Sequence, residues 1–216
     1  MKTLIEFIRE SGQDTGLIDE MVQDYLKNFG SSNICSAVET AIKNTNNILE
    51  VFNKNQLAEY VNGQMLGRII EKELAKSCDF NGFTFRQGSE GKDEKDIECE
   101  SVGEYLDEKY NDILGNVKEK HNYGIELKCT QSSKPVGNKS YAMDPTDDNT
   151  RKGKQSFYIT ITNIHWKNGS GENLSAQITN YNIYFGFLRQ IDWKGAAKGN
   201  SASVVPDAWK RMIRLK

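Results

Sequence analysis

The chain has 216 residues, of which 37% are hydrophobic and 27% are charged, and its formal net charge is −2. This composition is typical of a soluble globular protein that can bury one substantial core. The sequence contains no apolar run of about 18 residues, so a membrane-spanning helix is not predicted.

Residues 1–10 show the pattern of an amphipathic helix interrupted by Glu6 and Glu10, so a signal peptide is not predicted. The four cysteines form no Cys-x-x-Cys pair and there are only two histidines, which argues against a zinc site. Reduced, buried thiols are typical of proteins that stay inside the cell. We therefore expect a cytoplasmic protein.

The two halves of the chain differ in charge. Residues 123–216 contain 14 Lys and Arg against 7 Asp and Glu, so the acidic excess lies before them. A basic half favours a surface that faces a polyanion. A chance distribution of solvated charges is the alternative, and charge alone does not separate the two.

The first third of the chain has apolar residues at helical spacing. Residues 1–50 carry this pattern with a break near residues 11–16, and a second helix is predicted over residues 34–52. A single apolar stripe predicts a third helix over residues 56–76. Three asparagines, which are poor helix formers, lie in the second helix and leave its end uncertain: Asn44, Asn46 and Asn47.

From residue 79 onward the pattern changes to short alternating or β-branched segments. Strands or strand-like turns are predicted at residues 81–85, 96–99, 123–130, 157–166 and 176–193. A helical insertion at 100–121, a long polar loop at 132–154 and a short basic helix around Trp209 complete the pattern. Helices followed by strands predict an α+β fold with one domain.

The strand at residues 123–130 carries a candidate catalytic pair. Its alternation places Glu126 and Lys128 side by side on one face. With Asp96 upstream, they form the outline of a site with two carboxylates and one lysine, whose oxygens suit Mg²⁺. The main-chain carbonyl of Leu127 could add a ligand.

In such a site the cation polarises a phosphate and activates water, while the lysine offsets developing charge. The alternative interpretation of Glu126 and Lys128 is an ordinary surface ion pair, worth about 0–1 kcal/mol.

A polar, basic loop directly follows this strand. Seven of its residues are candidates for contacts with phosphates or bases: Thr130, Gln131, Ser132, Asn138, Lys139, Ser140 and Tyr141. Simple solvation of a polar loop is the alternative. For His121 and His165 we favour structural roles over catalytic ones.

Three segments, in this order, resemble one known family: Lys-Asp-Ile at residues 95–97, Ile-Glu-Leu-Lys-Cys-Thr at 125–130, and Gly-Asn-Lys-Ser-Tyr-Ala at 137–142. Together they are similar to the PD-(D/E)xK nuclease superfamily, and within it to type II restriction endonucleases of the ScaI-like branch. The resemblance covers roughly residues 87–202.

The resemblance implies a restriction-endonuclease-like fold, with a central mixed β-sheet flanked by helices. It also implies cleavage of double-stranded DNA at a short palindrome by a homodimer that uses Mg²⁺, with Mn²⁺ able to substitute. Asp96 and Glu126 correspond to the metal-binding acids and Lys128 to the catalytic lysine. A DNA methyltransferase acting on the same site, without a stable complex, is implied as a partner in a prokaryotic cell.

On this reading residues 1–216 form a single nuclease domain. Its mainly helical part, residues 1–78, would serve dimerisation or DNA contact; residues 79–202 would form the catalytic sheet; and residues 203–216 would form a basic C-terminal helix.

The sequence departs from the family pattern in two ways. No proline precedes Asp96, and the gap from Asp96 to Glu126 is long, which leaves Glu98 as an alternative first acid. A helix before the first strand often lends a further glutamate in such folds, and Glu71 is the candidate here. Two other functions stay open: a structure-specific repair or resolvase nuclease, and a DNA-binding protein without catalytic activity.

Overall fold

The computed structural model describes residues 20, 22–24, 26–77, 85–87, 97–99, 123–133, 143–144, 152–153, 156–188, 192–194 and 203–216. The helix predicted at residues 1–10 and the insertion predicted at 100–121 lie outside these residues. No helix in the described part of the chain is both long and apolar enough to cross a membrane.

A long helix and a shorter one form the helical layer. A π-helical turn, η1 (Leu26–Gly30), leads into α3 (Ser31–Lys54), which confirms the predicted second helix and extends it at both ends. The predicted third helix is wrong at its start, because Ala58–Tyr60 form a separate 3₁₀ turn, η2, and α4 spans Gly63–Ser77. The Asn62 side chain accepts a hydrogen bond from the Met65 amide at 2.9 Å, so it caps α4 at this point.

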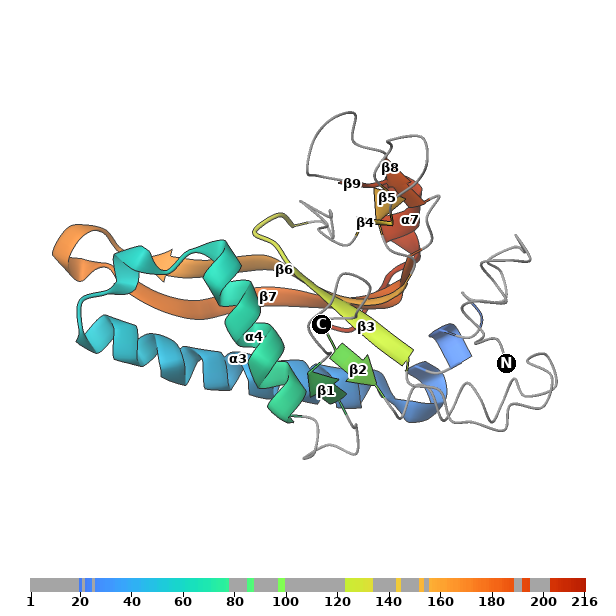
Figure 1. Ribbon diagram of the computed structural model, residues 1–216, viewed down its shortest axis with the longest axis horizontal. Helices are drawn as coiled ribbons and strands as arrows, with labels where there is room; N and C mark the ends of the chain where they lie inside the picture. The colour runs from blue at the N-terminus through green and yellow to red at the C-terminus, as the bar shows by residue number, and fades with distance from the viewer. Residues whose placement is uncertain are drawn as a thin grey trace.

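The main sheet has six strands in the order β1-β2-β3-β6-β7-β10 (Figure 1). The strands are β1 (Phe85–Gln87), β2 (Ile97–Cys99), β3 (Tyr123–Cys129), β6 (Ser156–Asn168), β7 (Ser175–Leu188) and β10 (Ile213–Arg214). Only β3 and β6 pair in parallel, whereas the other neighbours are antiparallel. The sheet is therefore mixed, and with its helices it confirms the predicted α+β, restriction-endonuclease-like fold.

Two small sheets and a short helix lie at the end of β6 and β7 that is opposite their hairpin (Figure 1). The small sheets pair β4 (Met143–Asp144) with β5 (Lys152–Gly153), and β8 (Trp193–Lys194) with β9 (Ser203–Val204). The basic C-terminal helix is shorter than predicted: α7 spans Pro206–Arg211, and the next residues form β10. The Arg211 guanidinium donates to the buried Asp192 carboxylate at 2.7 Å, which fixes α7.

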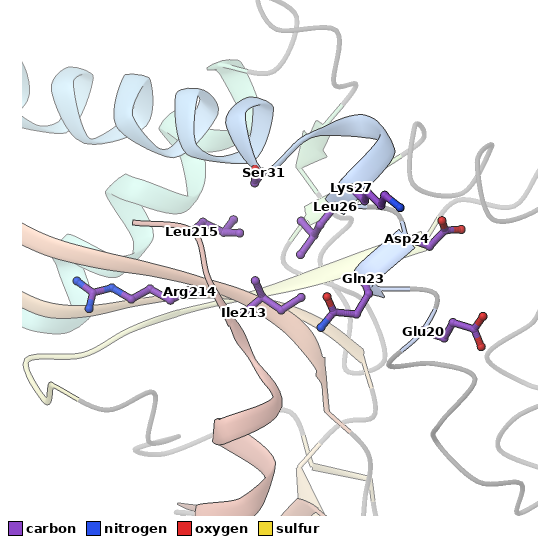
Figure 2. A pocket seen from close by; sticks show the side chains of 9 residues that line it. All are labelled: Glu20, Gln23, Asp24, Leu26, Lys27, Ser31, Ile213, Arg214 and Leu215. Carbon is purple, nitrogen blue, oxygen red and sulfur yellow. The ribbon is translucent and has the colours of Figure 1, made fainter.

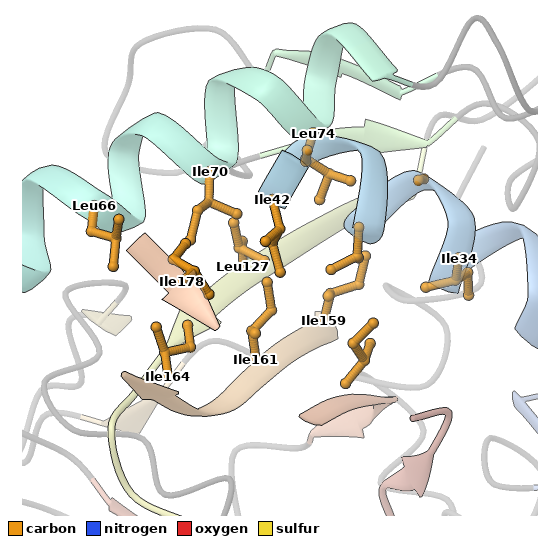
Figure 3. Packing of buried hydrophobic residues seen from close by; sticks show 14 of the residues in the cluster. Ile34, Ile42, Leu66, Ile70, Leu74, Leu127, Ile159, Ile161, Ile164 and Ile178 are labelled. Atoms are coloured by element: carbon orange, nitrogen blue, oxygen red, sulfur yellow. The ribbon is translucent and has the colours of Figure 1, made fainter. Parts of the chain in front are cut away.

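Different helices pack on the two faces of the sheet. One face carries Leu127, Ile159 and Ile161, which pack with residues of α3 and α4 in one apolar cluster (Figure 3). On the opposite face, Tyr158 and Leu188 pack with Ala208 and Met212 from the region of α7. Because side chains alternate along each strand, the odd-numbered residues of β3 face the long helices and the even-numbered ones face away from them.

Two asparagines of α3 bind the edge of β7. Asn46 donates to the Ile178 carbonyl at 3.0 Å and accepts from the Ile178 amide at 2.8 Å. Asn53, two helical turns later, makes the same pair of bonds with Ala176 at 3.0 and 2.7 Å. The edge of β7 thus finds its partners in side chains instead of another strand, a role that overrides the poor helix propensity of asparagine.

An open groove of about 710 Å³ lies between the residues that precede α3 and the C-terminal strand (Figure 2). Charges of both signs line it, from Glu20, Asp24, Lys27 and Arg214. None of the predicted site residues lines this groove, so we do not assign it to the active site.

Candidate active site

The predicted acid–lysine pair lies in the middle of the sheet. Glu126 and Lys128 are on β3, where the parallel ladder pairs them with Tyr158 and Thr160 of β6. The Lys128 ammonium donates to Oε2 of Glu126 at 3.4 Å. Both side chains belong to the face that turns away from α3 and α4, since Leu127 between them packs into the helical cluster.

The burial of this pair excludes an ordinary surface ion pair. Glu126 is 1% exposed, and the Lys128 side chain is 22% exposed. Taking an ionised carboxylate out of water in such a place costs several kcal/mol, and its contacts, the one with the Lys128 ammonium among them, must offset this cost. An apolar residue here would avoid the cost altogether, so the burial of an acid at this position supports the prediction of a chemical role.

The chain beyond β3 stays attached to β6. The Thr130 amide donates to the Ile161 carbonyl at 2.9 Å, and the Thr130 carbonyl accepts from the Ile164 amide at 3.2 Å. The Ser132 carbonyl accepts from the Asn163 amide at 2.8 Å. Three predicted DNA contacts, Thr130, Gln131 and Ser132, therefore follow the acid–lysine pair directly on a segment held by backbone hydrogen bonds.

A β-bulge in β6 lies beside this segment. The register between β6 and β7 shifts between Thr162 and His165, and Asn163 adopts a positive φ of 56°. The exposed His165 ring lies 3.1 Å from the Asn163 side-chain oxygen. The structural role of His165 stays a prediction, and His121 lies outside the described residues.

The structure does not place the other predicted site residues beside Glu126 and Lys128. Asp96, the side chain of Glu98, and the group Asn138, Lys139, Ser140 and Tyr141 lie outside the described residues. Glu71 is on α4, whose apolar residues pack on the face opposite to that of Glu126. Within the described ranges, no three His, Cys, Asp or Glu side chains form a group that could hold a metal ion.

The sequence did not reveal which residues flank the acid and the lysine. Tyr158 and Thr160 come beside them only through the parallel pairing of β3 with β6, and both are buried. The β-branched and aromatic run at residues 157–166 predicted a strand, and this was the one available signal. The partner of that strand depends on tertiary structure and was not accessible from the pattern.

Comparison with known protein families gives the family of the chain. A family profile described as ScaI restriction endonuclease matches residues 105–214, a little more than half of the chain. The matched region includes β3 with the acid–lysine pair, and also β6 and β7. A search of curated proteins found no match. The chain belongs to the ScaI restriction endonuclease family, type II restriction enzymes of the PD-(D/E)xK type that cleave DNA.

Proposed function

We propose that this protein is a Mg²⁺-dependent type II restriction endonuclease that hydrolyses both strands of DNA at a short palindromic sequence. Asp96, Glu126 and Lys128 would form its catalytic centre. The observation that carries the proposal is the buried Glu126 carboxylate with the Lys128 ammonium 3.4 Å away, next to an anchored polar segment. Mn²⁺ is expected to substitute for Mg²⁺.

The donor atoms at the pair suit a hard divalent cation. Glu126 offers carboxylate oxygens on a rigid strand, and the Leu127 carbonyl and the Asp96 carboxylate would complete the protein ligands. A bound cation would supply Lewis-acid polarisation of the phosphate and activation of water. Lys128, partly exposed beside Glu126, would hold a phosphate oxygen or the attacking water and offset the charge that develops in the transition state.

The antiparallel pairing of β2 with β3 bears on the choice of the first acid. Ile97 pairs with Ile125 and Glu98 pairs with Gly124, so Glu98 lies two pairs from Glu126 along the ladder. Two ligands of one ion are well placed when their residues lie directly opposite one another, with Cβ atoms about 4.5–5.5 Å apart. The register of Glu98 therefore supports the other candidate, Asp96, as the first acid.

A homodimer follows from the symmetry of the proposed substrate. Both strands of a palindrome must be cut and each chain has one proposed centre, so two chains related by a two-fold axis would act together. A DNA methyltransferase that protects the same sequence in the prokaryotic cytoplasm would be the functional partner, without a stable complex.

The decisive experiment incubates the protein with a long DNA of known sequence and Mg²⁺. Discrete fragments would support restriction activity. Binding without cleavage in Mg²⁺ or Mn²⁺ would contradict the proposal and favour a non-catalytic DNA-binding protein. Cleavage only at branched or mismatched structures would contradict it in favour of a structure-specific nuclease.

Single substitutions then test the assigned centre. Asp96→Asn, Glu126→Ala and Lys128→Ala should each abolish cleavage and retain most specific DNA binding, while Glu98→Gln should retain activity. Lys43→Ala on the exposed face of α3 is the matched control for Lys128→Ala and should cut like the wild type. Full activity of Lys128→Ala would show that the centre is wrongly assigned.

A further inference from the structure

Past the Thr162–Asn182 pair, β6 and β7 continue together as a two-stranded ribbon that ends in a hairpin. We call residues 163–168 of β6 and 175–181 of β7 the distal ribbon. Figure 1 shows these strands running to the hairpin alongside α3 and α4. β3 ends before this part of β6, so the distal ribbon extends the sheet beyond the acid–lysine pair.

One side of the distal ribbon is fixed to the helices. Ile164, Ala176 and Ile178 are buried in the apolar cluster with α3 and α4. Asn46 and Asn53 hold the β7 edge through the four hydrogen bonds described above. The ribbon is therefore a rigid platform, since backbone and side chains are both held, and its other side can present groups in a defined geometry.

The other side is exposed and polar. His165 pairs directly with Asn180 across the ribbon, and both are exposed, as are Gln177 and Thr179. Within the described chain, no hydrogen bond or ion pair occupies the side chains of Gln177, Thr179 or Asn180. The ribbon strands contain no Asp or Glu, and their one lysine, Lys167, donates to the Glu59 carbonyl of η2 at 3.0 Å.

This exposed side belongs to the same face of the sheet as the acid–lysine pair. Thr160 lies beside Lys128, and the ladder continues through the Thr162–Asn182 pair to His165 and Asn180. The segment from Thr160 to His165 spans at most roughly 16 Å, because a regular strand rises about 3.3 Å per residue and the β-bulge at Asn163 shortens it. Duplex DNA rises about 3.4 Å per base pair, so this span corresponds to at most roughly five base pairs.

We propose that the exposed side of the distal ribbon, centred on Asn180 and His165 with Gln177 further out, enters the major groove and contacts base edges. This inference rests on the proposed function and names its specificity surface. The major groove admits a two-stranded β-ribbon, and the carboxamide of Asn or Gln matches the N6 and N7 edge of adenine. The absence of acidic side chains on the ribbon strands suits approach to a polyanion.

The test uses the full-length protein and a duplex carrying the site found with wild-type enzyme. Asn180→Ala should lower the cleavage rate at this site by roughly 5- to 150-fold, as expected for loss of one bidentate base contact, and should relax selectivity at one base pair. Gln177→Ala should act in the same direction with a smaller effect. Asn47→Ala, on the exposed face of α3, is the matched control and should leave rate and selectivity unchanged.

A base analogue identifies the contact itself. Replacing adenines of the site one at a time with 7-deazaadenine removes the major-groove N7 acceptor. At one position this replacement should weaken wild-type cleavage but cause no further loss with Asn180→Ala, because the two changes remove the same contact. Additive losses at every position would overturn the inference.

The outcomes separate this inference from the proposed function. If the wild type cuts DNA at discrete sites and Asn180→Ala, Gln177→Ala and the double variant keep full rate and selectivity, the distal ribbon does not contact bases and only this inference fails. If the wild type cuts no DNA while Glu126→Ala and the wild type bind DNA equally, the proposed function itself has failed, and the inference fails with it.

Discussion

The two hydrogen bonds between Asn46 and the edge of β7 lead to a quantitative prediction about stability. Asn46→Ala removes both hydrogen-bond partners of Ile178, a residue that is 4% exposed. Each buried backbone group left without a partner costs about 1–3 kcal/mol, so the two groups cost about 2–6 kcal/mol together. Alanine is a better helix former than asparagine and returns about 0.5 kcal/mol. The net loss in unfolding free energy should be about 1.5–5.5 kcal/mol.

Equilibrium unfolding in urea measures this loss. Because urea slopes are about 1–3 kcal/mol per molar, the midpoint of Asn46→Ala should fall by on the order of 1 M or more. Asn47→Ala is the matched control, since it makes the same substitution at the next residue of α3, whose side chain is exposed. It should gain about 0.5 kcal/mol from helix propensity alone. Equal urea midpoints for the two variants would refute the argument that the hydrogen bonds of the Asn46 side chain hold the edge of β7.

Three further predictions concern stability and reactivity. Gly186→Ala should lower the free energy of unfolding by about 1–3 kcal/mol, since its Cβ would lie 3.2 Å from the Met212 Cα; an unchanged urea midpoint would contradict this. The hydrogen bond to Glu39 raises the pKa of Lys216 above its ordinary value of 10.5. The pair should add at most about 1 kcal/mol to the free energy of unfolding, because both side chains are exposed, and this contribution should be present below pH 10.5 and lost as the pH rises through the raised pKa. If wild type stays more stable than Lys216→Met at higher pH, the prediction is wrong. Burial raises the pKa of the Cys35 thiol. At neutral pH this thiol should therefore be alkylated more slowly in the folded protein than in the unfolded protein, as mass spectrometry of the peptide that contains Cys35 would measure. Equal alkylation rates would contradict the burial.

Local patterns predicted the elements whose own residues determine them. The alternation around Glu126 defined β3, and the β-branched run at residues 157–166 defined most of β6. The start of α4 was missed because the apolar stripe continues through η2, and only the Asn62 cap marks the true beginning. β10 was missed because two residues carry no strand pattern, and their conformation comes from pairing with β7.

The candidate site was predictable in its residue types but not in its surroundings. Glu126 and Lys128 followed from spacing on one strand, whereas the burial of Glu126 depends on tertiary structure, including the pairing of β3 with β6. The asparagines of α3 appeared to weaken a helix, because propensity describes the helix alone and not the strand edge that Asn46 and Asn53 bind. The distal ribbon carries no recognisable sequence motif. A role for its polar residues is suggested only by their position in the sheet, beyond the acid–lysine pair.

The arrangement of β6 bears on the choice between a sequence-specific and a structure-specific nuclease. Its first half pairs with the strand of Glu126 and Lys128, and its second half forms the distal ribbon. If Asn180 contacts a base, the offset between that base and the cut phosphate is set by the backbone hydrogen bonds of β6 on both sides of its bulge, and the strands cannot slide without breaking several of these bonds. An enzyme that cuts at a constant distance from the bases it recognises needs such a fixed offset. A nuclease that recognises a junction or a mismatch by shape has no need of it, so a base contact by Asn180 would favour the sequence-specific function over the structure-specific one.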